Sequence, residues 1–140
     1  MARDRAFGLL RVIRMCERSQ KEQIGAMEVL VIEDNLDLRE MIIEVLELQG
    51  FDAVAVGDGG EALRLLRNGT KPSLILLDRS TPVLDGPAFL KAAAGVLSGI
   101  PVVWMTGADD DRPHPSVVAT LRKPFLIEDL LQLVRSHALP

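Results

Sequence analysis

Acidic, hydroxyl and lysine side chains follow four of the five short apolar runs in this sequence. Glu33 and Asp34 follow the first run, Asp78 the third, Thr106 the fourth and Lys123 the fifth. If these runs are parallel strands, their carboxyl ends meet at one edge of a sheet, where open α/β sheets bind their ligands. We therefore expect the five side chains to converge on one site.

The types of these residues suit phosphoryl transfer. Three carboxylates brought together repel one another unless a cation joins them, and an all-oxygen ligand set favours a hard ion such as Mg²⁺. A carboxylate such as that of Asp78 is also a nucleophile toward phosphorus. Thr106 and Lys123 would supply a hydroxyl group and a positive charge to the phosphoryl oxygens. The set predicts a magnesium-dependent phosphoryl-transfer site.

Each residue also has a plainer interpretation when it is taken alone. Asp34 and the following Asn35 are both good helix N-caps. Asp78 is also a suitable start for a solvated loop, Thr106-Gly107 is common in turns, and Lys123-Pro124 is common in loops. Only their joint occurrence at successive strand ends favours a shared site.

The elements that must position these residues alternate along the chain. Apolar runs that predict strands buried on both faces of a parallel sheet occur at Glu28–Ile32, Asp52–Val56, Ser73–Leu77, Ile100–Met105 and Val117–Leu121. Stripes with helical spacing lie after them, at residues 38–48, 62–66, 89–97 and 126–134. Strand alternating with helix predicts an α/β doubly wound sheet with right-handed crossovers.

One segment interrupts this alternation. Between Met105 and Val117 the chain contains Pro113 and Pro115, and proline is excluded from helix interiors. We expect a loop or a single turn there instead of a full helix.

Composition narrows the class of protein. The chain has 140 residues, a net charge of −4, one cysteine and two histidines. A disulfide framework and a multi-ligand zinc site are therefore excluded. No apolar run approaches the roughly 18 residues of a membrane-spanning helix, and the weak acidity argues against a nucleic-acid footprint over the whole surface. These properties predict a soluble, cytoplasmic domain.

The first 26 residues differ from the rest. Residues 1–26 carry six basic and three acidic side chains, a balance of +3, which leaves −7 for residues 27–140. We expect 1–26 to be a basic N-terminal extension and 27–140 to be the domain. The extension is interpreted either as an appendage that precedes a true start at Met27 or as a basic amphipathic helix that docks on a partner or a membrane surface.

From Met27 onward the sequence resembles the receiver domain of the two-component response regulator family. The motifs that carry the resemblance are VLVIEDN at Val29–Asn35, LILLDRSTPVLDG at Leu74–Gly86, VVWMTG at Val102–Gly107 and KPF at Lys123–Phe125. The resemblance implies a flavodoxin-like (βα)₅ sheet with strand order 2-1-3-4-5.

The resemblance also implies roles for individual residues. Asp78 is expected to be the phosphoacceptor. Glu33 and Asp34 are expected to hold Mg²⁺ together with Asp78, and the backbone carbonyl of Ser80 completes the protein ligands. Thr106 is the expected switch hydroxyl, and Lys123 is the expected contact to the phosphoryl group.

Two departures from the family pattern concern its output surface. Thr120 stands where the family usually has a tyrosine or phenylalanine three residues before the lysine. The spacing of 17 residues from Thr106 to Lys123 is short, so we expect the fourth helix of the fold to be shortened or lost.

Three functional hypotheses remain open. The first is a stand-alone receiver that takes a phosphoryl group from a histidine kinase or histidine phosphotransfer protein and signals through altered binding of a downstream protein. Because the chain ends directly after the last predicted helix, this hypothesis expects no direct nucleic-acid binding. It also expects no enzymatic activity beyond the protein's own phosphorylation and dephosphorylation. A homodimer is compatible with it. The second is a pseudo-receiver, an interaction module not controlled by phosphorylation. The third is an aspartyl-phosphate phosphatase or other hydrolase. Such enzymes of the haloacid dehalogenase type have a second acid two residues after the nucleophile, and here Ser80 stands at that position.

Overall fold

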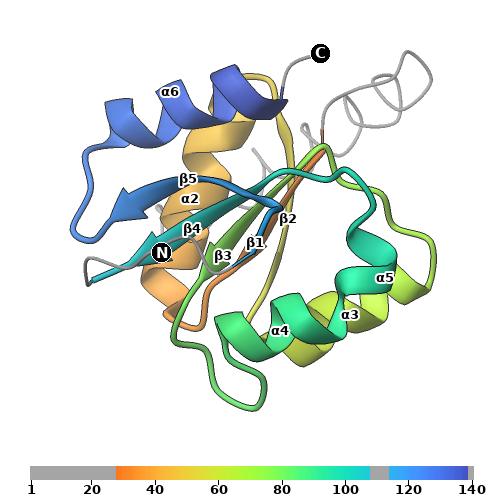
Figure 1. Ribbon diagram of the computed structural model, residues 1–140. Helices are drawn as coiled ribbons and strands as arrows, with labels where there is room; N and C mark the ends of the chain where they lie inside the picture. Colours follow the sequence, from red (N-terminus) through yellow and green to blue (C-terminus); the bar gives the residue numbers. More distant parts are fainter. Residues whose placement is uncertain (1–27, 108–113, 139–140) are drawn as a thin grey trace, which may run out of the picture.

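A computed structural model describes residues 28–107 and 114–138 and contains a five-stranded parallel sheet with helices on both faces (Figure 1). The spatial order of the strands is β2-β1-β3-β4-β5. This confirms the doubly wound fold that the alternation of strands and helices predicted and the strand order that the family resemblance implied. The strands are β1 Glu28–Ile32, β2 Asp52–Val56, β3 Leu74–Asp78, β4 Val102–Thr106 and β5 Val117–Arg122.

Two hydrophobic clusters hold the helices to the sheet. On one face, α2 (Leu36–Leu48) and α6 (Ile127–Ala138) pack against the strands; on the other lie α3 (Gly59–Arg67), α4 (Gly86–Ala92) and α5 (Ala94–Leu97) (Figure 1). Strands β3 and β4 are buried along their whole length. Burial on both faces explains why the central strands are continuous apolar runs and do not alternate with polar residues.

The helix ends follow the local rules of the sequence. Asn35, Asp58 and Asp85 are N-caps whose side chains accept hydrogen bonds from backbone N–H groups at the start of α2, α3 and α4. Gly50 and Gly69, just past α2 and α3, have positive φ angles of 91° and 99°. Glycine suits these two helix ends, since residues with a side chain rarely adopt this conformation.

Two predicted strands are shifted toward their carboxyl ends. The apolar run Ser73–Leu77 becomes β3 Leu74–Asp78, and Ile100–Met105 becomes β4 Val102–Thr106. The apolar run ends at the first polar residue, but the backbone hydrogen bonds between the strands continue beyond it. Asp78 pairs with Met105, and the Arg79 N–H donates to the Met105 carbonyl at 2.9 Å. Asp78 and Thr106 are therefore the last residues of strands and not the first residues of loops.

The third predicted helix is divided in two. Ala93 ends α4 and begins α5 without a side chain that could cap the new helix. No helix lies between β4 and β5 at the described positions 107 and 114–116. The remainder of the predicted loop, residues 108–113, lies outside the described residues, as does the predicted basic extension 1–26. Within the described ranges, no helix has the length and apolar character needed to cross a membrane.

Candidate functional site

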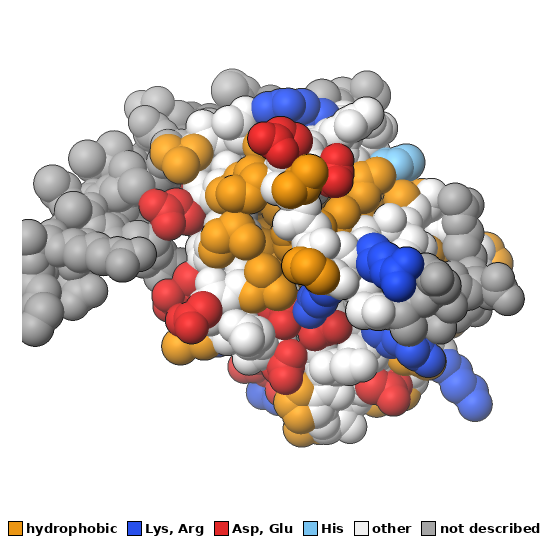
Figure 2. Space-filling model, turned by 90° about the vertical axis from the view of Figure 1, so that its left-hand side faces the viewer, with side chains coloured by type: hydrophobic (Ala, Val, Ile, Leu, Met, Phe, Trp, Pro, Cys, Tyr) orange, Lys and Arg blue, Asp and Glu red, His pale blue; other side chains and the backbone are white. Residues whose placement is uncertain are grey.

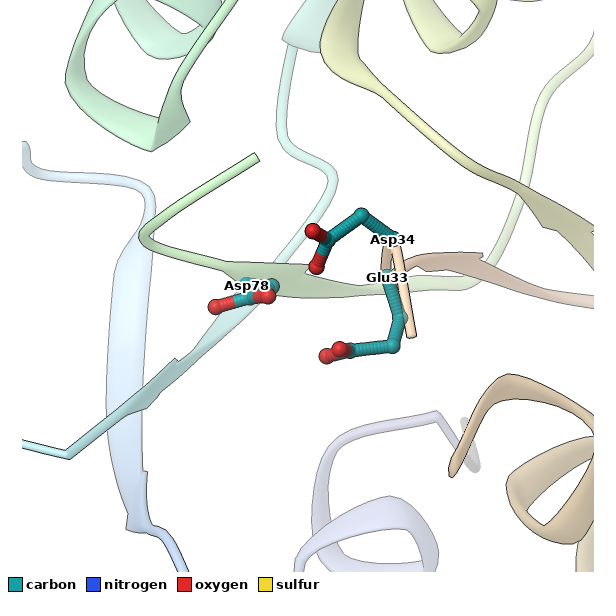
Figure 3. Close-up of side chains that lie close together, drawn as sticks. All are labelled: Glu33, Asp34 and Asp78. Atoms are coloured by element: carbon teal, nitrogen blue, oxygen red, sulfur yellow. The ribbon is translucent and has the colours of Figure 1, made fainter. Parts of the chain in front are cut away.

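Three carboxylates meet at the carboxyl ends of neighbouring strands. Because Ile32 pairs with Leu77, the next residues along β1 and β3 bring Glu33 beside Asp78. One carboxylate oxygen from each of Glu33, Asp34 and Asp78 lies within 4.8 Å of the others (Figure 3). Glu33 and Asp78 are only 1% and 5% exposed, whereas Asp34 is open to solvent. The convergence predicted for these three acids is therefore present.

Lys123 joins the cluster from the far edge of the sheet. Its Nζ lies 2.7 Å from Glu33 Oε2 and 3.3 Å from Asp78 Oδ2. Its backbone N–H donates to the Thr106 carbonyl at 2.8 Å, which continues the pairing of β5 with β4 beyond the strand end. The lysine is thus fixed at its backbone while its ammonium group bridges two of the three acids.

The charges of the site are not balanced by Lys123 alone. Burial raises the pKa of Glu33; the hydrogen bond from Lys123 opposes this rise, and the nearby negative charge of Asp78 adds to it. Burial lowers the pKa of Lys123, but its hydrogen bond to Glu33 and the charges of both buried acids outweigh that effect and raise it. The cluster therefore favours an additional cation.

The loop after β3 orients the Asp78 carboxylate. The Ser80 N–H donates to Asp78 Oδ1 at 3.1 Å, while Oδ2 faces Lys123. Thr106 is buried at the end of β4, one residue beyond Met105, the ladder partner of Asp78. The structure thus places Thr106 on the strand next to the proposed acceptor, as expected. The Ser80 carbonyl as a metal ligand stays a prediction.

Two residues that support the acidic cluster were not assigned to it from the sequence. The Asn35 N–H donates to Glu33 Oε1, and Arg39 Nη1 donates to the backbone carbonyl of Glu33, both at 3.2 Å. Asn35 is the N-cap of α2, so the capping interpretation is correct for Asn35, while Asp34 belongs to the cluster. A capping motif is a recognisable signal, whereas nothing in the sequence pattern indicates that Arg39 turns back toward the strand.

Exposed apolar side chains also gather at this edge of the sheet. Among the described residues, five large hydrophobic side chains are exposed, and four of them lie in the loops or helix starts that follow β1, β3 and β5. Figure 2, which views this side of the molecule, shows hydrophobic side chains beside acidic and basic ones. We call these four residues the apolar rim: Leu36 (54% exposed), Val83 (90%), Leu126 (64%) and Ile127 (44%).

Comparison with known proteins agrees with this geometry. Residues 29–135 match the sequence model of a family described as response regulator receiver domain. The chain belongs to this family. The receiver domain is 34% identical over 117 residues to the DNA-binding response regulator MtrA of Mycolicibacterium paratuberculosis, an alignment that covers 78% of this chain and 50% of MtrA. The chain thus spans about half the length of the curated relatives it matches.

Solved structures show the same architecture. The receiver domain of the Francisella response regulator 1452 is 28% identical, with a TM-score of 0.71 and coverage of 80% of this chain and 96% of that one. The receiver domain of the sensor histidine kinase PA1611 from Pseudomonas aeruginosa PAO1, described with a magnesium ion coordinated in its active site cleft, is 24% identical. It has a TM-score of 0.72 and coverage of 81% and 98%. These likenesses show the receiver fold, and the family match places the chain among receiver domains of two-component signalling.

Proposed function

We propose that this receiver domain accepts a phosphoryl group on Asp78 from a histidine kinase or histidine phosphotransfer protein and signals by a change in partner binding. The observation that carries the proposal is the meeting of three carboxylates within 4.8 Å of one another, with the Lys123 ammonium 3.3 Å from Asp78. A nucleophilic oxygen, a set of metal ligands and a fixed positive charge are thus available in one place.

In the proposed reaction, a carboxylate oxygen of Asp78 forms a bond to phosphorus while the bond from phosphorus to the donor histidine nitrogen breaks. The leaving imidazole keeps the electron pair of that bond and takes up a proton. The Ser80 N–H on Oδ1 and the Lys123 ammonium near Oδ2 hold the carboxylate in one orientation, and restricting the reacting geometry is a large part of catalysis in phosphoryl transfer. Lys123 and Thr106 then face the transferred oxygens.

Glu33, Asp34 and Asp78, with the Ser80 backbone carbonyl, would hold Mg²⁺. The fit rests on the donor set, since every side chain offers oxygen and the cluster carries more negative charge than Lys123 offsets. When it is bound, the metal supplies positive charge that offsets the charge of the phosphoryl oxygens. The magnesium ion described in the PA1611 receiver domain agrees with this proposal.

The apolar rim supports a protein as the phosphoryl donor. A donor must approach Asp78 across the surface formed by the loops after β1, β3 and β5, and this surface presents Leu36, Val83, Leu126 and Ile127. Exposed apolar side chains that cluster on one face indicate a protein contact, whereas a small phosphate compound has no need of them. We place this exchange in the cytoplasm and expect no enzymatic turnover of other substrates.

The downstream partner of this receiver is considered apart from its phosphoryl donor. MtrA is named a DNA-binding response regulator, so a DNA-binding effector controlled by this receiver is compatible with the proposal. The receiver fold itself is proposed to act through protein contacts. The pseudo-receiver alternative is favoured by one observation, the exposed Thr120 on β5 in place of the usual aromatic residue.

Acetyl phosphate and beryllofluoride, each with Mg²⁺, test the proposal. We expect acetyl phosphate to transfer one phosphoryl group per chain, mapped by peptide mass analysis to Asp78, and beryllofluoride, which mimics a phosphoryl group, to bind in the same proportion. Asp78→Asn should fold normally and take up none. The matched control is Asp37→Asn, which changes an exposed carboxylate in the first turn of α2 and should leave labelling intact. Absence of any modification supports the pseudo-receiver, and sustained turnover of phosphate esters supports a hydrolase.

A further inference from the structure

Glu33 is held at each of its polar groups. Its backbone N–H donates to the Val56 carbonyl at 3.1 Å, which ties it to β2. Its Oε1 accepts from the Asn35 N–H and its Oε2 from Lys123. The fourth contact is different in kind, because Arg39 reaches back from inside α2 and donates from Nη1 to the Glu33 backbone carbonyl at 3.2 Å.

We propose that Arg39 is a positioning residue that sets the Mg²⁺ affinity of the acidic pair. The carbonyl oxygen of Glu33 belongs to the planar peptide group that leads into Asp34, so a bond to this oxygen fixes the plane from which Asp34 departs. Asp34 is exposed, and no described residue donates a hydrogen bond to its carboxylate. The Arg39 guanidinium therefore orients Asp34 through the backbone, since no described residue orients the Asp34 carboxylate directly. This inference rests on the proposed function of the site.

The contribution of Arg39 is one of position and not of charge. Arg39 contacts the backbone carbonyl of Glu33 and not a carboxylate oxygen of the cluster. A hydrogen bond from a charged donor to a carbonyl is both stronger and more directional than a neutral one. Arg39→Lys keeps the positive charge but lacks the planar fork and its reach. Arg39→Lys therefore distinguishes a role of Arg39 in positioning from a role through its charge.

Gly57 leaves the space that Arg39 occupies. A Cβ built on Gly57 would lie 2.8 Å from Arg39 Nη1 and would meet no other heavy atom within 4 Å. The described glycines with positive φ angles are Gly50, Gly69 and Gly99, so alanine is compatible with the backbone of Gly57. The methyl group of Gly57→Ala would thus displace the guanidinium without any change to Arg39 itself.

These facts allow a double-mutant cycle with Mg²⁺ itself as the probe. Isothermal titration calorimetry of the full chain with Mg²⁺ should show affinity weakened about tenfold in Arg39→Met, the effect typical of removing a group that orients a metal ligand. Arg39→Lys should be weakened too, and Gly57→Ala should shift affinity in the same direction. The double variant should bind no more weakly than Arg39→Met. The matched control is Gly95→Ala, where an added Cβ meets nothing within 4 Å.

A second readout separates positioning from folding and from chemistry. Thermal unfolding in EDTA should give every variant a single transition. The rate of Asp78 labelling by acetyl phosphate should fall at low Mg²⁺ and return to the wild-type value at saturating Mg²⁺. Wild-type Mg²⁺ affinity in Arg39→Met, or additive effects of Arg39→Met and Gly57→Ala, would overturn the positioning role alone. Failure of the wild type to bind Mg²⁺ would instead overturn the proposed function. If Arg39→Met does not fold, Gly57→Ala with its Gly95→Ala control decides the question.

Discussion

Gly86, the first residue of α4, touches both the loop after the proposed acceptor and the buried tryptophan. A Cβ at this position would lie 2.7 Å and 2.9 Å from Trp104 Cη2 and Cζ3, and 2.9 Å from the Arg79 Cα. Trp104 is 1% exposed, and Arg79 is the residue directly after Asp78. Neither neighbour can move freely, so Gly86→Ala should force both the indole ring and the acceptor loop to shift.

The expected loss of stability follows from two opposing effects. Overpacking a well-packed site costs about 1–3 kcal/mol. Alanine in place of glycine in a helix gains back about 0.5–1 kcal/mol, and the gain is small here because Gly86 lies at the helix end. We expect the free energy of unfolding to fall by about 1–2 kcal/mol in Gly86→Ala.

Urea denaturation followed by far-ultraviolet circular dichroism measures this change. Gly95→Ala is the control, since its added methyl meets nothing within 4 Å, and it should be neutral or stabilising. Trp104→Phe should partly rescue Gly86→Ala, because phenylalanine has a smaller ring system and contacting residues commonly couple by about 0.5–3 kcal/mol. Labelling of Asp78 should slow in Gly86→Ala and recover in the double variant. Wild-type stability of Gly86→Ala, or strictly additive effects with Trp104→Phe, would refute the reasoning.

Two further predictions concern backbone strain and pH. Val83 has a φ of 66° and is 90% exposed, and the Leu84 N–H donates to the Pro82 carbonyl across it at 2.7 Å. Val83→Gly should therefore raise the free energy of unfolding, measured by urea denaturation, by about 1 kcal/mol, because glycine relieves the left-handed strain. Val83→Ala should raise it less. Equal increases in the two variants would contradict this explanation. The raised pKa of Glu33 means that the folded state holds this proton more tightly than the unfolded chain. In EDTA, the stability of wild type relative to Glu33→Gln should be greatest at low pH and should fall as pH rises above 4.5, the usual value; a difference that grows with pH would contradict the shift.

The sheet and the acidic cluster could be predicted because both follow from short-range rules. Continuous apolar runs between amphipathic stripes determine a parallel sheet, and parallel strands deliver the residues at their carboxyl ends to one edge. Glu33 and Asp78 meet because β1 and β3 are neighbours, and the resemblance to receiver domains, not the apolar runs, implied that these two strands are adjacent.

The supporting contacts could not be predicted for a different reason. The bond from Arg39 to the Glu33 carbonyl depends on the angle at which α2 leaves β1 and on the absence of a side chain at Gly57. The apolar rim consists of exposed residues in loops and at helix starts. Leu126 and Ile127 belong to the helical stripe predicted at 126–134, but the structure leaves both exposed because the stripe is buried only from Leu130 onward. The position of Asp78 inside β3 depends on its pairing with Met105 in β4, which is not visible in the hydropathy of either segment.

The packing of Trp104 has a spectroscopic consequence. The chain contains one tryptophan and no tyrosine, so its near-ultraviolet emission comes almost entirely from a single indole. That ring lies against Gly86 next to the Arg79 backbone, and within the described residues its buried Nε1 has no hydrogen-bond partner. The protein therefore carries an intrinsic optical probe at the base of the acceptor loop. Changes in that loop on adding Mg²⁺ or a phosphoryl donor can be followed in real time on unlabelled wild-type protein.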